Sequence, residues 1–99
     1  MLNITNTKRE DELIVGLEGR LDTTTSPQLE ENMNAQLEGV KYLTFDLKQF
    51  EYISSAGLRV LLSSQKTMNK QGRMSVKNVS EEVQEIFEVT GFSDIFTIE

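Results

Sequence analysis

Apolar and polar residues alternate along the first part of the chain. In the first segment, 2–7, Leu2 and Ile4 alternate with polar residues, and in the second, 13–17, Leu13, Val15 and Leu17 alternate with Ile14, Gly16 and Glu18. A polar stretch, 7–11, lies between the two segments. A period of two is typical of strands that bury one face, and a short polar stretch between them suits a hairpin turn. We therefore expect two antiparallel strands at the amino terminus.

A helical spacing follows. Pro27 suits the first turn of a helix that has Ser26 as its cap. A start a few residues earlier, behind Asp22, is the alternative. Gly39 stands where such a helix is expected to end. The apolar stripe of this helix is formed by Leu29, Met33 and Leu37.

The stretch 41–74 carries the strongest pattern in the chain. Residues 41–47 are rich in apolar and aromatic side chains and predict a buried strand, and 48–54 predict a loop. A helix is expected from Ser55 to just before Gly72. Its core-facing stripe comprises Leu58, Leu61, Leu62 and Met68, with Gln65 as the polar exception.

The remaining residues predict a strand, a helix and a short last strand. The strand covers 74–79, the helix is capped by Ser80 and closed by Gly91, and the last strand covers 95–98. The order is β-β-α-β-α-β-α-β in one domain, 1–99. Alternating strands and helices favour parallel pairing, so the fold class is α/β with a mixed sheet packed with helices.

In such a sheet the loops that lead from strands into helices meet at one edge, where ligands and partners usually bind. Here that edge is expected to gather 22–26, 48–55 and 78–80. The serine pair Ser54–Ser55 stands at its centre, at the start of a helix. Backbone N–H groups at a helix start lack intrahelical acceptors and carry partial positive charge. The expected groups are those of Ala56, Gly57 and Leu58.

Composition excludes several kinds of site. The chain has 99 residues, no cysteine and no histidine, so disulfides, Ser-His-Asp and Cys-His triads and zinc sites built from these ligands are ruled out. The net charge of −6 argues against direct binding of nucleic acid. No stretch reaches the about 20 apolar residues of a membrane span, and no signal-peptide pattern is visible, so we expect a cytoplasmic protein without membrane insertion.

The serine pair has two interpretations besides catalysis. Without histidine, the base for a serine nucleophile would be a lysine or a carboxylate such as Asp22, Asp46 or Glu51, and carboxylates are poor bases for a hydroxyl. No nucleotide-binding fingerprint is present, so we expect no enzyme, cofactor or metal. A phosphate on one serine would make the edge strongly anionic. Simple capping of the helix, worth about 1 kcal/mol, is the alternative and the one that the residues alone favour.

A resemblance changes that balance. The run 52–62, Tyr-Ile-Ser-Ser-Ala-Gly-Leu-Arg-Val-Leu-Leu, preceded by Leu-Thr-Phe-Asp-Leu at 43–47, closely resembles the signature of the STAS domain. Within that family the chain is most similar to the single-domain anti-sigma factor antagonists of bacteria. Gly-Arg-Leu-Asp at 19–22 and Phe-Glu-Val-Thr-Gly-Phe at 87–92 match further family elements in the right order.

The resemblance implies a phosphorylation switch. In the family, the serine that opens the second helix is phosphorylated by an anti-sigma factor that is itself a serine kinase, and a serine phosphatase reverses this. The unphosphorylated form binds the kinase and frees a sigma factor. The motif places the acceptor at Ser55, with Ser54 as a rival because the family usually has aspartate there. The implied docking edge comprises Asp22, Thr23, Ser54, Ser55, Ala56, Gly57 and Arg59.

Other functions stay open at this point. A STAS module can also act without phosphorylation, as a scaffold or accessory subunit of a stress-signalling or lipid-transport complex. A small-ligand sensor at the same edge is a third hypothesis. Many relatives carry a further C-terminal helix, and its absence here is compatible with a homodimer.

Overall fold

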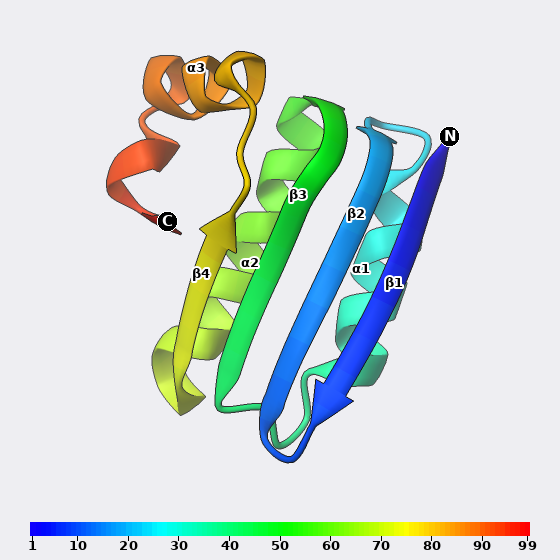
Figure 1. Ribbon diagram of the computed structural model, residues 1–99, viewed down its shortest axis with the longest axis vertical. Coiled ribbons are helices and arrows are strands. Elements are labelled where there is room, and N and C mark those ends of the chain that lie inside the picture. The colour runs from blue at the N-terminus through cyan, green and yellow to red at the C-terminus, as the bar shows by residue number, and fades with distance from the viewer.

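The computed structural model describes residues 1–99 and contains one five-stranded sheet (Figure 1). The strands follow one another across the sheet in the order β1-β2-β3-β4-β5. Only the β1–β2 pair is antiparallel, and the other three pairs are parallel. The elements are β1 (Leu2–Arg9), β2 (Glu12–Leu21), α1 (Ser26–Gln36), β3 (Tyr42–Ile53), α2 (Ser55–Gln71), β4 (Arg73–Lys77), α3 (Glu81–Thr90), the 3-10 helix η1 (Phe92–Asp94) and β5 (Thr97–Ile98). The predicted element order and mixed sheet are confirmed.

The helices cover one face of the sheet. Figure 1 shows α1 and α2 together behind the strands, α3 beyond the end of β4, and nothing over the front face. The strand residues that point toward α1 and α2 are the buried ones, whereas their neighbours along each strand are exposed or half-buried. This one-sided arrangement explains the alternation of apolar and polar residues in the sequence.

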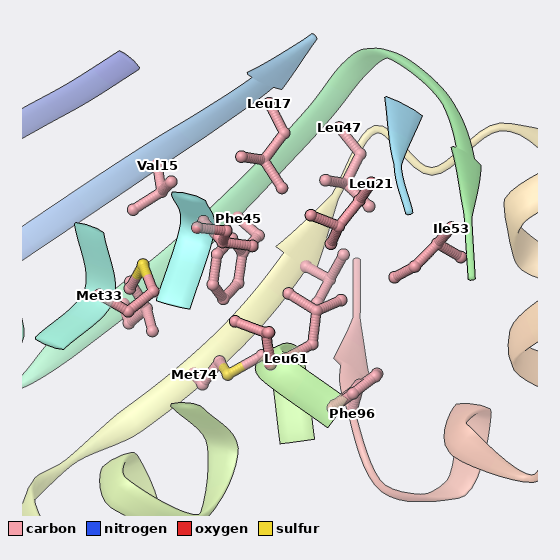
Figure 2. Close-up of a cluster of buried hydrophobic side chains, with 14 of the residues drawn as sticks. Val15, Leu17, Leu21, Met33, Phe45, Leu47, Ile53, Leu61, Met74 and Phe96 are labelled. Atoms are coloured by element: carbon pink, nitrogen blue, oxygen red, sulfur yellow. The ribbon is translucent and has the colours of Figure 1, made fainter. Parts of the chain in front are cut away.

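The core lies between the sheet and the two long helices. Fully burying an aliphatic or aromatic side chain of this kind stabilises a fold by about 1.5–3 kcal/mol. At the other end of the core, the rings of Phe87 and Phe96 meet edge to face with centroids 5.5 Å apart, which ties α3 to the C-terminal segment. The side chains labelled in Figure 2 include Val15, Leu17, Phe45, Leu47, Met33 and Leu61.

The predicted loop over 48–54 is wrong, because β3 continues to Ile53. Along β2 the register advances two residues from Gly16 to Glu18 while β3 advances three, and a second extra residue follows at Glu51. These irregularities are bulges on β3. They replace the period of two by a spacing of three between the buried Leu47, Phe50 and Ile53, a spacing that imitates a loop in the sequence.

Several predicted boundaries also shift. The hairpin is longer than expected, since β1 runs to Arg9 and only residues 10–11 form the turn, whereas 7–11 was predicted. Ser26 is the first residue of α1 rather than its cap, and its buried hydroxyl donates to the carbonyl of Asp22. The β4 strand ends at Lys77, two residues before its predicted end, and the predicted last strand shortens to β5.

The sequence suggested that Gln65 lies outside the buried stripe of α2, but the structure places it within that stripe. Its side chain is buried, its Nε2 donates to Oδ1 of Asn69 at 2.9 Å, and its Oε1 has no hydrogen-bond partner. A buried oxygen without a donor carries a desolvation cost. Gln65 is therefore a weak point in the largely apolar buried face of α2, which also includes Ser64.

Candidate functional site

The carboxyl ends of β2 and β3 lie side by side and form what we call the tip, residues 20–25 and 51–59. Leu21 is paired with Ile53 in the sheet register, and the N–H of Ser54 donates to the carbonyl of Leu21 at 2.8 Å. Asp22 and Ser54, 32 positions apart in sequence, therefore leave the sheet from neighbouring strands. This confirms the part of the predicted edge formed by 22–26 and the serine pair.

The two serines have different places at the start of α2. Ser54 is the N-cap: its Oγ accepts from the N–H of Gly57 at 3.3 Å, and its carbonyl accepts from the N–H of Leu58 at 2.9 Å. Ser55 is the first helical residue and is exposed, and its hydroxyl is not part of the cap. The cap interpretation therefore belongs to Ser54, while the Ser55 hydroxyl stays available for chemistry.

The same bonds correct the expectation for the free backbone groups. The N–H groups of Gly57 and Leu58 were expected to be open, but Ser54 satisfies both. The N–H groups left without an acceptor at the start of α2 are those of Ser55 and Ala56. The positive end of the helix dipole is thus presented beside the Ser55 hydroxyl itself.

Gly57 presses the first turn of α2 onto the strand ends. A Cβ at this position would lie 2.7 Å from Cγ of Leu21 and 2.9 Å from Cγ1 of Ile53, closer than van der Waals contact allows. Both neighbours are buried, with 0% and 2% of their surface exposed. The glycine therefore allows the close approach that fixes where Ser55 stands relative to the sheet.

Asp22 holds the loop that faces the serines. Its Oδ1 accepts from the backbone N–H groups of Thr24 and Thr25, both at 3.0 Å, and lies 3.2 Å from Oγ1 of Thr25, which donates its hydrogen to the carbonyl of Arg20 at 2.9 Å. The N–H of Thr25, followed by that of Thr24, holds the pKa of the Asp22 carboxyl below its usual value of 3.8, although partial desolvation opposes this. Asp22 is therefore an anion at neutral pH, and its Oδ2 is left outside these bonds.

The remaining predicted residues divide into those at the tip and those away from it. Thr23, Glu51 and Arg59 are exposed at the tip, and Ala56 is half-buried there. Asp46 was expected to lie near the serine pair, but the structure places it elsewhere. It lies in the middle of β3 and accepts from Nδ2 of Asn78 at 2.9 Å, eight strand residues or on the order of 20 Å from Ser54. Segment 78–80 was also expected at this edge. Asn78 instead lies beside Asp46, because β4 is shorter than β3 and ends before the tip.

One pair at the tip was not predicted from the sequence. The guanidinium carbon of Arg20 lies 4.6 Å from the ring centroid of Tyr52, which is within cation–π range. Tyr52 is 36% exposed and belongs to β3. The sequence does not predict this pair, because the residue that faces Arg20 depends on a strand register that contains two bulges.

Two further features of the structure concern metal sites and membrane spans. Nowhere in residues 1–99 do three or more aspartate or glutamate side chains gather in a way that could hold a metal ion. None of the three helices is both long and apolar enough to span a bilayer. What the tip provides is an exposed hydroxyl at a helix start, a fixed carboxylate and a stacked Arg–Tyr pair.

Comparison with known proteins places this arrangement in a family. The family model of the STAS domain matches residues 3–99. The chain belongs to the STAS domain family. Among its relatives, BtrV of Bordetella bronchiseptica is 35% identical over 99 residues, with 98% of this chain and 85% of BtrV covered. The anti-sigma-B factor antagonist of Bacillus subtilis is 31% identical over 98 residues, covering 98% of this chain and 90% of that protein.

The fold of this STAS domain is also that of solved structures. The Bacillus cell fate determinant SpoIIAA in its phosphorylated form superposes with a TM-score of 0.74 at 15% identity, covering 100% of this chain and 91% of SpoIIAA. An identity this low supports the fold alone. The α/β fold predicted for a STAS domain is thus confirmed by both the sequence family and the structure.

Proposed function

We propose that this STAS domain is an anti-sigma factor antagonist, controlled by phosphorylation of Ser55. In its unphosphorylated form it binds an anti-sigma factor that is also a serine kinase, and the sigma factor is released. A serine phosphatase returns the modified form to the binding state. The role is regulatory binding in the cytoplasm rather than catalysis.

The observation that carries this proposal is the division between the two serines. Ser54 is half-buried and its Oγ is used by the helix cap, whereas Ser55 is exposed and outside the cap. A kinase needs an accessible hydroxyl whose modification leaves the fold intact. Ser55 meets both conditions, so it is favoured over the rival acceptor Ser54.

Charge explains how a phosphate would act there. A phosphoserine adds about −1.5 to −2 charges at pH 7, and the start of a helix tolerates an anion. At neutral pH the tip already carries the negative charge of Asp22 and the exposed Glu51. A partner seated on the tip would meet a concentrated negative charge at the point of closest contact. Phosphorylation would therefore remove the partner without unfolding the protein.

The relatives support the same role. The protein from Bacillus subtilis that shares 31% of its residues is named an anti-sigma-B factor antagonist. SpoIIAA, with the same fold, has been seen in a phosphorylated form. These names belong to those proteins, and they make an anti-sigma factor kinase the first partner to test here.

The test uses the anti-sigma factor kinase of the same host. The purified kinase with ATP should transfer one phosphate, located by mass spectrometry on Ser55. Ser55→Ala should abolish transfer and Ser54→Ala should retain it, with Ser63→Ala, another exposed serine on α2, as the matched control. Ser55→Glu should lose binding to the kinase.

Two results would contradict the proposal. If Ser55→Ala accepted phosphate on Ser54 as efficiently as wild type accepts it, the assignment of the switch to Ser55 would be wrong. Binding of a partner that is equally tight for wild type and Ser55→Glu, with no phosphate transferred, would show a scaffold function without a switch.

A further inference from the structure

Arg20 and Tyr52 are neighbours across β2 and β3, and their side chains stack on each other. They face each other directly in the register of β2 and β3, just after the second bulge of β3. Successive side chains along a strand point to opposite faces of the sheet. The next residues, Leu21 and Ile53, point into the core, so Arg20 and Tyr52 point to the other face. The pair therefore lies on the uncovered side of the strand ends, while Ser55 starts α2 on the covered side.

The bonding of Arg20 leaves its guanidinium free for a partner. The residue's hydrogen bonds run through its backbone: its N–H donates to the carbonyl of Met1 at 3.1 Å and its carbonyl accepts from Oγ1 of Thr25 at 2.9 Å. The ring of Tyr52 supports one face of the guanidinium. The N–H groups at the edge of the guanidinium remain available as donors, and their planar, forked arrangement matches the two oxygens of a carboxylate. A group positioned in advance in this way loses little entropy on binding.

The surroundings of Arg20 are acidic. A hollow of about 390 Å³ beside it is lined by Glu18 and Glu51 among other residues. Arg20 is thus the one cationic side chain in this hollow, beside two carboxylates and the amino terminus of Met1. The complementary surface carries one carboxylate inside a group of basic side chains. Tyrosine and arginine are also the residue types that contribute most of the energy in protein interfaces.

We propose that the Arg20–Tyr52 pair is the anchor through which the unphosphorylated protein holds its kinase partner. The partner offers an apolar recess to the ring of Tyr52, a carboxylate to Arg20, and basic side chains to Glu18 and Glu51. These basic side chains lie over the bare face and away from the Ser55 hydroxyl, so a phosphate on Ser55 gains no counter-charge from them. This inference rests on the proposed function, because it names how the same partner is held. It adds a second contact region, on the other side of the strand ends from Ser55.

The chain contains its own control for this idea. Tyr42 and Arg73 are also a cross-strand tyrosine–arginine pair, between β3 and β4, and both are exposed. They start their strands, so they lie at the opposite end of the sheet from the tip. Substitutions in this pair change composition and charge in the same way without touching the proposed anchor.

The experiment measures the Kd of the kinase by isothermal titration calorimetry, with a non-hydrolysable ATP analogue so that no phosphate is transferred. Arg20→Ala and Tyr52→Ala should each weaken binding roughly 30-fold, the loss typical of a hot spot. Arg20→Lys should lose about tenfold because it cannot stack or bind a carboxylate through two N–H groups. Tyr42→Ala and Arg73→Ala should stay within about threefold of wild type. Circular dichroism and thermal unfolding verify that each variant is folded.

Each remaining outcome decides the question. If wild type binds the kinase and Ser55→Glu does not, but Arg20→Ala and Tyr52→Ala bind like wild type, the anchor is refuted and the proposed function stands. An equal loss in the Tyr42 variant also refutes the anchor. If wild type does not bind the kinase at all, the proposed function fails and the anchor fails with it.

The charge of the partner surface is tested separately. Glu51→Lys should slow association with the kinase at low salt several-fold, and raising the ionic strength should reduce the difference. Association rates that are the same for Glu51→Lys and wild type at every salt concentration would refute the basic surface around the carboxylate.

Discussion

The close approach at Gly57 can be tested by adding one methyl group. In Gly57→Ala the new Cβ would stand 2.7 Å from Cγ and 2.8 Å from Cδ2 of Leu21, and 2.9 Å from Cγ1 of Ile53. Overpacking of this kind costs about 1–3 kcal/mol. Alanine is better than glycine in a helix by up to about 1 kcal/mol, which offsets part of this cost. We expect a net loss of about 1–2 kcal/mol in the free energy of unfolding.

The loss is measured by urea denaturation and by thermal unfolding, where it corresponds to a Tm lower by roughly 5–15 °C. A second background makes the test specific. In Leu21→Ala two of the three close contacts are removed and the one with Ile53 remains, so adding Gly57→Ala should cost less there than in wild type. The coupling between the two positions should reach about 0.5–2 kcal/mol. A stability of Gly57→Ala equal to wild type, or additive effects of the two substitutions, would refute the argument that close contact dictates the glycine.

Three further predictions concern stability. Ser54→Ala should lower the free energy of unfolding by about 1 kcal/mol through loss of the cap, while Ser55→Ala should stay within about 0.5 kcal/mol of wild type; equal urea midpoints for the two variants would contradict this. Because the pKa of Asp22 is lowered on folding, its stabilisation is complete above the usual value of 3.8 and is lost as the pH falls through the folded pKa, so the stability difference between wild type and Asp22→Asn should shrink from pH 7 to pH 3. A difference independent of pH would be evidence against it. Gln65→Met should raise stability by about 1 kcal/mol in urea denaturation, since it removes the unpartnered Oε1 and frees the exposed Asn69 to bind water; a loss would show that Oε1 is satisfied in solution.

The sequence was sufficient for the order of elements, because the spacings are strong and glycines or serines stand at most helix ends. Ser80 caps α3 as predicted, with its Oγ accepting from the N–H of Val83 at 3.2 Å, and Gly91 ends the helix at a φ of +83°. Such signals are local and depend on a few neighbouring residues. They therefore do not require knowledge of which strands pair.

The features that could not be predicted depend on pairing. An extra residue in β3 leaves no local mark except a spacing of three, which a loop produces equally well. The stacking of Arg20 on Tyr52 follows from that register, so it could not be found before the bulges were known. The choice between Ser54 and Ser55 as the cap depends on a shift of one residue, which a serine pair in sequence does not resolve.

The sheet has helices on one face only, and this sets a requirement on whatever binds the strand ends. The stacked pair projects from the bare face, and the exposed serine opens a helix on the covered face. A partner that packs flat on the bare face, or on the helices, reaches only one of these groups. A partner that approaches along the strands meets the strand ends directly and contacts both at once, so the direction of approach decides whether one surface can read the two groups together.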